Sequence, residues 1–143
     1  MRRSVWLCGV FLCGVGASAL TAQRPTSTEQ GVYSPAQAAR GQQVYGQRCA
    51  QCHADDLSGT DFGDGAPALK RADFMAERTL KDVFDRIKRG MPFDAPGSLS
   101  DQEYVDVVTY LLRENGHPAG TQELAPTADV LGSLVVSRRG ARP

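Results

Sequence analysis

The sequence carries no surplus of charge of either sign and has few histidines and few cysteines. Its 16 Lys and Arg residues balance 16 Asp and Glu residues, so the formal net charge is zero. No basic stripe with interleaved aromatic side chains is present, and we therefore expect no nucleic-acid partner. The 143 residues leave room for one domain rather than two. Convincing strand patterns and internal repeats are also missing, which favours a small helical fold.

The first 22 residues differ from the rest of the chain. Arg2 and Arg3 precede twenty residues without a charge, and small residues, including an Ala-Ser-Ala triplet, gather at the end of this run. This pattern is typical of a cleavable secretory signal, with cleavage after Ala19 or Ala22. An uncleaved membrane anchor is the alternative, since about 20 apolar residues can span a bilayer. We therefore expect export to the periplasm as a soluble or peripherally associated protein, with membrane attachment only if the segment is retained.

Cleavage of this segment would leave very little cysteine. Cys8 and Cys13 would be removed, and only Cys49 and Cys52 would remain. Two cysteines three positions apart cannot form the disulfide framework that holds many small exported domains together. A zinc site requires four ligands, and His117 is the only histidine outside this motif. A thioredoxin-like pair is expected near a βαβ unit, and no such pattern flanks these cysteines.

The segment Cys49-Ala50-Gln51-Cys52-His53 has the C-x-x-C-H spacing of covalent c-type haem attachment. Two thiols three positions apart at a helix end can each add to one vinyl group of the porphyrin. The next residue is then held beneath the iron, where neutral imidazole is a strong axial ligand. The motif predicts one covalently bound haem c, with His53 as an iron ligand.

The sixth iron ligand must come from farther along the chain. Met91 is the best candidate, because it lies between a glycine that ends a helix and a proline, in an irregular segment. A Met–His pair would raise the reduction potential. Met75 is the competitor, although it also suits a short helix or a core position, and His117 is a remote third option.

Pro67 lies 14 residues after His53, in a loop rich in Asp and Gly. A ligating histidine normally donates its other ring N–H to a carbonyl or carboxylate. A backbone carbonyl in this loop could accept that bond, although a loop proline needs no function.

The pattern of apolar residues and caps predicts three main helices. They are expected from Ser34 into Cys49, from Thr79 to Gly90, and from the capping box of Ser100 and Glu103 to Asn115-Gly116. These helices place one domain at residues 35–116. Residues 23–34 are expected to be a flexible linker, and residues 117–143 a C-terminal extension with one short apolar patch.

Over residues 35–116 the sequence resembles class I cytochromes c. The resemblance is carried by Gly41 and Tyr45, the haem motif, Ala66-Pro67-x-Leu69, Gly90-Met91-Pro92 and Leu99-Ser100-Asp101. It implies an all-α fold of three to four short helices around one haem c, with a Pro67 carbonyl on the proximal histidine and Met91 as distal ligand. Shorter stretches, such as Thr79-Leu80-x-Asp82-Val83-Phe84, resemble cytochrome domains associated with quinoprotein (PQQ-dependent) dehydrogenases.

The haem motif and the two predicted axial ligands predict an electron-transfer protein rather than an enzyme. Because both axial positions would be filled by the protein, the iron could only cycle between Fe(III) and Fe(II). We expect electrons to pass from a periplasmic dehydrogenase to a downstream acceptor such as a terminal oxidase, with the chain a monomer or a loosely held complex subunit. The alternative is a ligand-binding or peroxidase-like haem protein with a displaceable sixth ligand.

Overall fold

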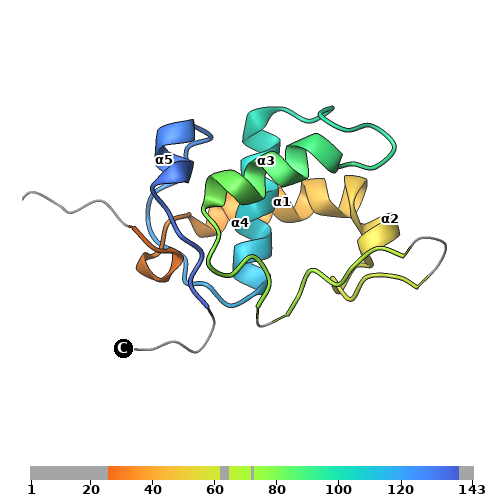
Figure 1. The fold of residues 1–143 in the computed structure, drawn as a ribbon, viewed down its shortest axis with the longest axis horizontal. Helices are drawn as coiled ribbons and strands as arrows, with labels where there is room; N and C mark the ends of the chain where they lie inside the picture. Colours follow the sequence, from red (N-terminus) through yellow and green to blue (C-terminus); the bar gives the residue numbers. More distant parts are fainter. Residues whose placement is uncertain (1–25, 62–64, 72, 139–143) are drawn as a thin grey trace, which may run out of the picture.

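The computed structural model describes residues 26–61, 65–71 and 73–138 (Figure 1). The segment expected to be a secretory signal, residues 1–22, lies outside these ranges. The helices in chain order are η1 (Thr28–Gln30), α1 (Pro35–Arg48), α2 (Ala50–His53), α3 (Leu80–Gly90), α4 (Asp101–Glu114) and α5 (Ala128–Gly132). Within the described ranges there are isolated β-bridges but no strand. The expected all-α fold is confirmed, with the short helices η1, α2 and α5 in addition to the three that the sequence predicts.

Each of the three main helices begins where its cap predicts. The Ser34 side chain accepts a bond from the Gln37 N–H at 3.1 Å, with Pro35 in the first turn of α1. Both α3 and α4 begin with a complete capping box. In each, the carboxylate of the third helical residue accepts a hydrogen bond from the backbone N–H of the cap residue. These bonds satisfy backbone N–H groups that have no partner inside the helix.

The helices α1 and α4 cross closely at the centre of the fold. Nine consecutive residues of α4, numbers 104–112, are buried, so α4 is a central helix rather than a one-sided surface helix. At the crossing, a Cβ on Gly41 would lie 1.8 Å from the carbonyl oxygen of Asp106. The rings of Tyr45 and Tyr110 pack beside it at an angle of 49°, with their centroids 5.1 Å apart. Only glycine at position 41 permits this approach.

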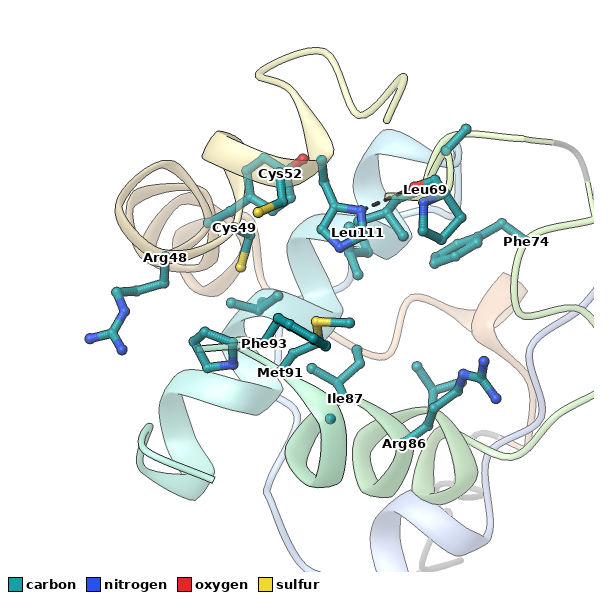
Figure 2. Close-up of a pocket in the computed structure, with 18 of the residues that line it drawn as sticks. Arg48, Cys49, Cys52, Leu69, Phe74, Arg86, Ile87, Met91, Phe93 and Leu111 are labelled. Carbon is teal, nitrogen blue, oxygen red and sulfur yellow. Dashed lines mark hydrogen bonds between the residues drawn. The ribbon is translucent and has the colours of Figure 1, made fainter. Parts of the chain in front are cut away.

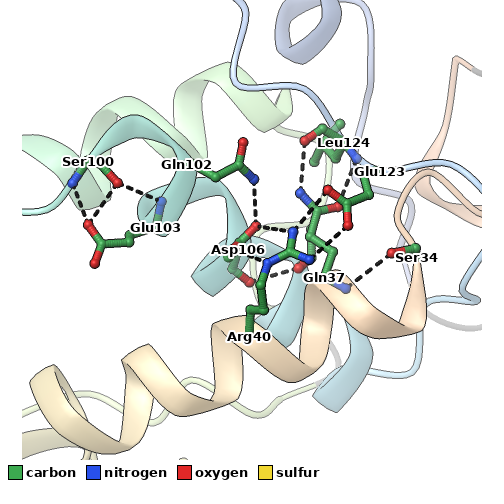
Figure 3. A network of polar contacts seen from close by, with 10 residues as sticks. Ser34, Gln37, Arg40, Ser100, Gln102, Glu103, Asp106, Glu123 and Leu124 are labelled. Carbon is green, nitrogen blue, oxygen red and sulfur yellow. Dashed lines mark hydrogen bonds and ion pairs between the residues drawn. The ribbon is translucent and has the colours of Figure 1, made fainter.

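A polar network joins this crossing to the C-terminal part of the chain (Figure 3). Arg40 on α1 bonds Asp106 of α4 at 2.9 Å and Glu123 at 2.8 Å. The Gln37 amide donates to the Leu124 carbonyl at 2.9 Å and accepts from the Leu124 N–H at 2.8 Å. These bonds fix residues 123 and 124 against α1.

The described part of the expected flexible linker, residues 26–34, is packed rather than extended into solvent. Val32 and Tyr33 are buried, and the Tyr33 hydroxyl donates to the His117 carbonyl at 2.7 Å. Gly31 has φ +67, and a Cβ on Gly120 would lie 2.0 Å from its carbonyl oxygen. The linker interpretation is therefore wrong for these residues, because their glycine serves a close backbone approach and not mobility.

The C-terminal extension folds back onto the domain. Its side chains add four residues to the core, namely Leu124, Leu131, Leu134 and Val136. Backbone bonds at 3.1 Å join Val135 to residues 26 and 28, and bonds at 2.8 and 2.9 Å join Val136 to residues 77 and 78. Residues 134–136 therefore connect the first described segment to the one that precedes α3. Within the described ranges, no helix is both long and apolar enough to cross a membrane.

Candidate haem-binding site

A cavity of about 840 Å³ opens between α2, α3, α4 and the loops that connect them. Its walls include the five residues that the sequence analysis assigns to haem binding: Cys49, Cys52, His53, Pro67 and Met91. Figure 2 shows the sulfur atoms of Cys49 and Met91 facing the same space from different elements. The fold thus brings to one cavity groups that are up to 42 positions apart in the sequence.

The thiols and the imidazole are placed by the junction of α1 and α2. Cys49 ends α1 and begins α2, and its carbonyl accepts a bond from the His53 N–H at 2.9 Å. This bond spans one helical turn, so residues 49 and 53 lie on the same face of α2. Directly after the turn, the Tyr45 hydroxyl donates to the Ala54 carbonyl at 2.6 Å. The attachment motif is therefore held by a backbone bond within the turn and by a side-chain bond to the residue that follows it.

The orientation of the His53 ring is set by a hydrogen bond to Pro67. The Nδ1 atom lies 3.0 Å from the Pro67 carbonyl oxygen. Since a carbonyl can only accept, Nδ1 must be the donor, which leaves the lone pair of Nε2 for a metal. The acceptor loop is held closed at Gly59, where φ is +80 and a Cβ would lie 2.2 Å from the Ala66 carbonyl oxygen. The geometry is that of an imidazole prepared as an axial ligand.

Met91 enters the cavity as the residue directly after α3. Its N–H makes the last bond of that helix, to the Ile87 carbonyl at 2.8 Å, and its φ of −133 turns the chain away from the helix axis. Its carbonyl accepts a bond from the Tyr104 hydroxyl at 2.7 Å. Met91 is half-buried, and its thioether is on the cavity wall.

The two competitors for the sixth ligand are placed differently. Met75 also lines the cavity, in a turn with φ +62 rather than in a helix, and it is buried. His117 is not on the cavity wall. It is buried elsewhere, with Nδ1 3.0 Å from the Thr28 hydroxyl and 3.3 Å from a Glu29 carboxylate oxygen. Two thioethers and one imidazole are therefore within the walls of the cavity.

Burial raises the pKa of the Cys49 thiol to about 11, against a smaller lowering by Arg48. Before attachment this thiol is protonated at neutral pH, unlike the low-pKa thiolate of a reactive redox cysteine. Within the described residues, no three His, Cys, Asp or Glu side chains gather to hold a metal ion. The cavity wall itself contains the His53 imidazole and the thioethers of Met75 and Met91.

Four arginines and one acid line the cavity, a charge distribution that the sequence analysis missed. Arg48 lies towards the thiols together with the exposed ring of Phe93, whereas Arg86 lies at the other end with Phe74 (Figure 2). The remaining charged residues of the wall are Arg71, Arg78 and Asp94. Within the described part of the chain, the side chains of Arg78 and Arg86 have no ion pair or hydrogen bond. These residues belong to separate elements, so no sequence motif could have revealed them.

The helical fold and this set of side chains define a cytochrome c domain. A family model described as cytochrome C oxidase, cbb3-type, subunit III, matches residues 36–111, which is more than half of the chain. The chain belongs to this family. It therefore carries haem c, and the two thiols, the oriented imidazole and the apolar cavity fit that group.

Two further proteins are similar to the chain. Over 79 residues it is 34% identical to thiosulfate dehydrogenase of Stutzerimonas stutzeri (strain A1501), a match that covers 51% of this chain and 26% of that protein. It thus spans about a quarter of this curated relative. The crystal structure of the sulfane dehydrogenase SoxCD from Paracoccus pantotrophus matches with 27% identity and a TM-score of 0.46, covering 73% of this chain and 59% of that one.

Proposed function

We propose that this chain is an exported single-haem electron carrier, or the electron-carrying part of a larger protein. The observation that carries the proposal is the position of Met91 on the wall of the cavity that also contains Cys49, Cys52 and His53. Haem c supplies reversible one-electron chemistry when both axial positions are filled by protein side chains.

The side chains have separate tasks in this proposal. Cys49 and Cys52 bind the porphyrin covalently, and His53, oriented by Pro67, is the proximal iron ligand. Met91 would fill the sixth position and would keep substrate and oxygen from the iron. Apolar side chains from α3 and α4 exclude water from the cavity: Val83, Ile87, Val107 and Leu111. A low-dielectric surrounding of this kind favours a high reduction potential for a Met–His pair.

Arg86, and Arg78 on the same cavity wall, are the residues that we expect to bind the two propionates. The vinyl groups and the propionates of a porphyrin lie on opposite edges, and Arg86 lies at the end of the cavity away from Cys49 and Cys52 (Figure 2). A guanidinium binds a carboxylate with two parallel hydrogen bonds. Both side chains lack an ion pair within the described ranges and are available for this contact.

The proposed electron donor is a dehydrogenase outside the cytoplasm. Support comes from the similarity to thiosulfate dehydrogenase and from the sequence resemblance to cytochrome domains associated with quinoprotein dehydrogenases. A terminal oxidase is the proposed acceptor. Export rests on residues 1–22, and mass spectrometry of the purified holoprotein should find the loss of 19 or 22 residues and the addition of one haem.

The sixth ligand decides between a carrier and a ligand-binding haem protein. If Met91 ligates, the ferric protein shows the weak far-red sulfur-to-iron absorption, and the ferrous protein resists carbon monoxide at neutral pH. Met91→Ala then loses the band, binds carbon monoxide and has a lower reduction potential. Met75→Ala is the matched control, since its side chain lines the same cavity and should keep the band. Rapid carbon monoxide binding by the unmutated protein would support the ligand-binding alternative, and a band that survives in Met91→Ala would move the ligand to Met75.

A further inference from the structure

Three buried tyrosines in this chain use their hydroxyls in the same way. Each donates to a backbone carbonyl: Tyr33 to His117 at 2.7 Å, Tyr45 to Ala54 at 2.6 Å and Tyr104 to Met91 at 2.7 Å. Two of these carbonyls belong to Met91 itself and to the residue that follows His53. Tyr104 does not line the cavity, so it contacts the Met91 backbone from outside the cavity.

Tyr104 is held rigidly on its own helix. Its N–H bonds the Ser100 carbonyl at 3.0 Å, in the first turn of α4, and the capping box of Ser100 and Glu103 secures that turn. Its side chain is fully buried, and its ring packs edge-on against Phe84 with the centroids 6.1 Å apart. The hydroxyl therefore has a fixed position relative to the core.

The Met91 segment, in contrast, has few constraints of its own. The helix α3 ends at Gly90, and the Ala95 N–H, which would bond the Met91 carbonyl if the helix continued, bonds the Pro92 carbonyl at 3.0 Å instead. Pro92 is buried, but the residues after it form local turns at the surface, and the Phe93 ring is 81% exposed. The Met91 carbonyl, which has no partner within α3, thus accepts its hydrogen bond from the Tyr104 hydroxyl of the central helix α4.

We propose that Tyr104 is a positioning residue for the sixth iron ligand. By holding the Met91 carbonyl, it fixes the backbone from which the thioether reaches the iron and opposes detachment of that thioether. The inference rests on the proposed function, because it requires Met91 to ligate. It assigns to Tyr104 a role that core packing alone does not explain, since packing of the ring would not need the hydroxyl.

The test is Tyr104→Phe in the ferric holoprotein, with imidazole as the probe. Imidazole binds only when Met91 has left the iron, so its apparent affinity reports the detached population. We expect Tyr104→Phe to keep the far-red band without imidazole and to bind imidazole about two- to tenfold more tightly, which corresponds to about 0.4–1.4 kcal/mol. The band should also disappear at a lower temperature than in the unmutated protein.

Tyr33→Phe is the matched control, because it removes an equally short bond from a buried hydroxyl to a carbonyl that is away from the cavity. It should weaken the fold while leaving the imidazole affinity unchanged. If Tyr104→Phe does not accumulate as holoprotein, Phe84→Leu keeps the hydroxyl but loosens the ring, and it should shift the imidazole affinity in the same direction by a smaller factor.

The outcomes separate this inference from the proposed function. Suppose that all the proteins show the far-red band and that Tyr104→Phe binds imidazole no more tightly than the unmutated chain. This result overturns the positioning role and leaves Met91 as the ligand. Equal tightening in Tyr33→Phe overturns it as well, because the effect would then reflect general destabilisation. No far-red band in the unmutated protein overturns the ligand assignment and the inference together.

Discussion

The crossing of α1 and α4 makes Gly41→Ala the most demanding test of the fold. The added Cβ would lie 1.8 Å from the carbonyl oxygen of Asp106 and 2.4 Å from its carbonyl carbon, whereas ordinary contact begins at 3.4 Å. The two helices must therefore move apart by about 1.6 Å at their closest point. The obstacle is backbone in the buried stretch of α4, so no side chain can rotate away to relieve it.

The expected loss follows from two opposing effects. Overpacking of a well-packed core destabilises typically by about 1–3 kcal/mol, and a clash with backbone belongs at the upper end of that range or above it. Alanine is better than glycine in a helix by about 0.8–1.0 kcal/mol, which offsets part of the loss. We expect Gly41→Ala to lower the free energy of unfolding by at least about 2 kcal/mol.

The assay is urea unfolding of the holoprotein, followed by far-ultraviolet circular dichroism, with the slope compared between variants. Gly46→Ala is the control on the same helix: a Cβ there meets nothing within 4 Å, so only the helix preference remains. It should stabilise the protein by about 0.5–1 kcal/mol. The reasoning is refuted if Gly41→Ala is as stable as the unmutated protein, or if both variants shift stability in the same direction.

Two further predictions concern Glu103 and His117. Hydrogen bonds from the Ser100 N–H and hydroxyl hold the pKa of Glu103 below its usual value, so its contribution to stability is present above the ordinary Glu range and is lost as the pH falls through the folded value. Urea unfolding of Glu103→Gln should therefore show a deficit below about 1 kcal/mol at pH 7 that disappears in acid. His117→Ala should cost about 1–3 kcal/mol, because it removes the buried imidazole partner of the Thr28 hydroxyl, which then keeps only the bond from the Ser137 N–H. Its haem spectrum should not change, since His117 is outside the cavity wall; a changed far-red band would contradict that placement.

The parts of the site that the sequence predicts are those whose chemistry requires a fixed local spacing. Haem attachment needs two thiols three positions apart with a histidine beside them, and a helix stop makes Met91 available. Pro67 could be proposed from the sequence because a ligating histidine needs an acceptor for its other ring N–H. In the structure its carbonyl oxygen lies 3.0 Å from the Nδ1 atom of His53. The choice between Met91 and Met75 stays a prediction, because both side chains line the cavity.

The features that sequence reasoning missed depend on contacts between distant segments. Arg78 and Arg86 lie on one cavity only because the turn before α3 and the helix itself face the same space. The helix α5 has five residues, too few for a periodic pattern to indicate it. Residues 23–34 were expected to be a flexible linker, but Gly31 in this segment is closely approached by the backbone of Gly120, which is 89 positions away. Local propensity contains no information about such a partner.

The pairing of residues 26–28 with residue 135 has a consequence for how this domain can be joined to other proteins. The two described ends of the chain lie side by side there, at the end of the domain away from α2 (Figure 1). A neighbouring domain connected through either end would be tethered there. The surface near the exposed Cys52, on the far side of the domain, would then stay uncovered.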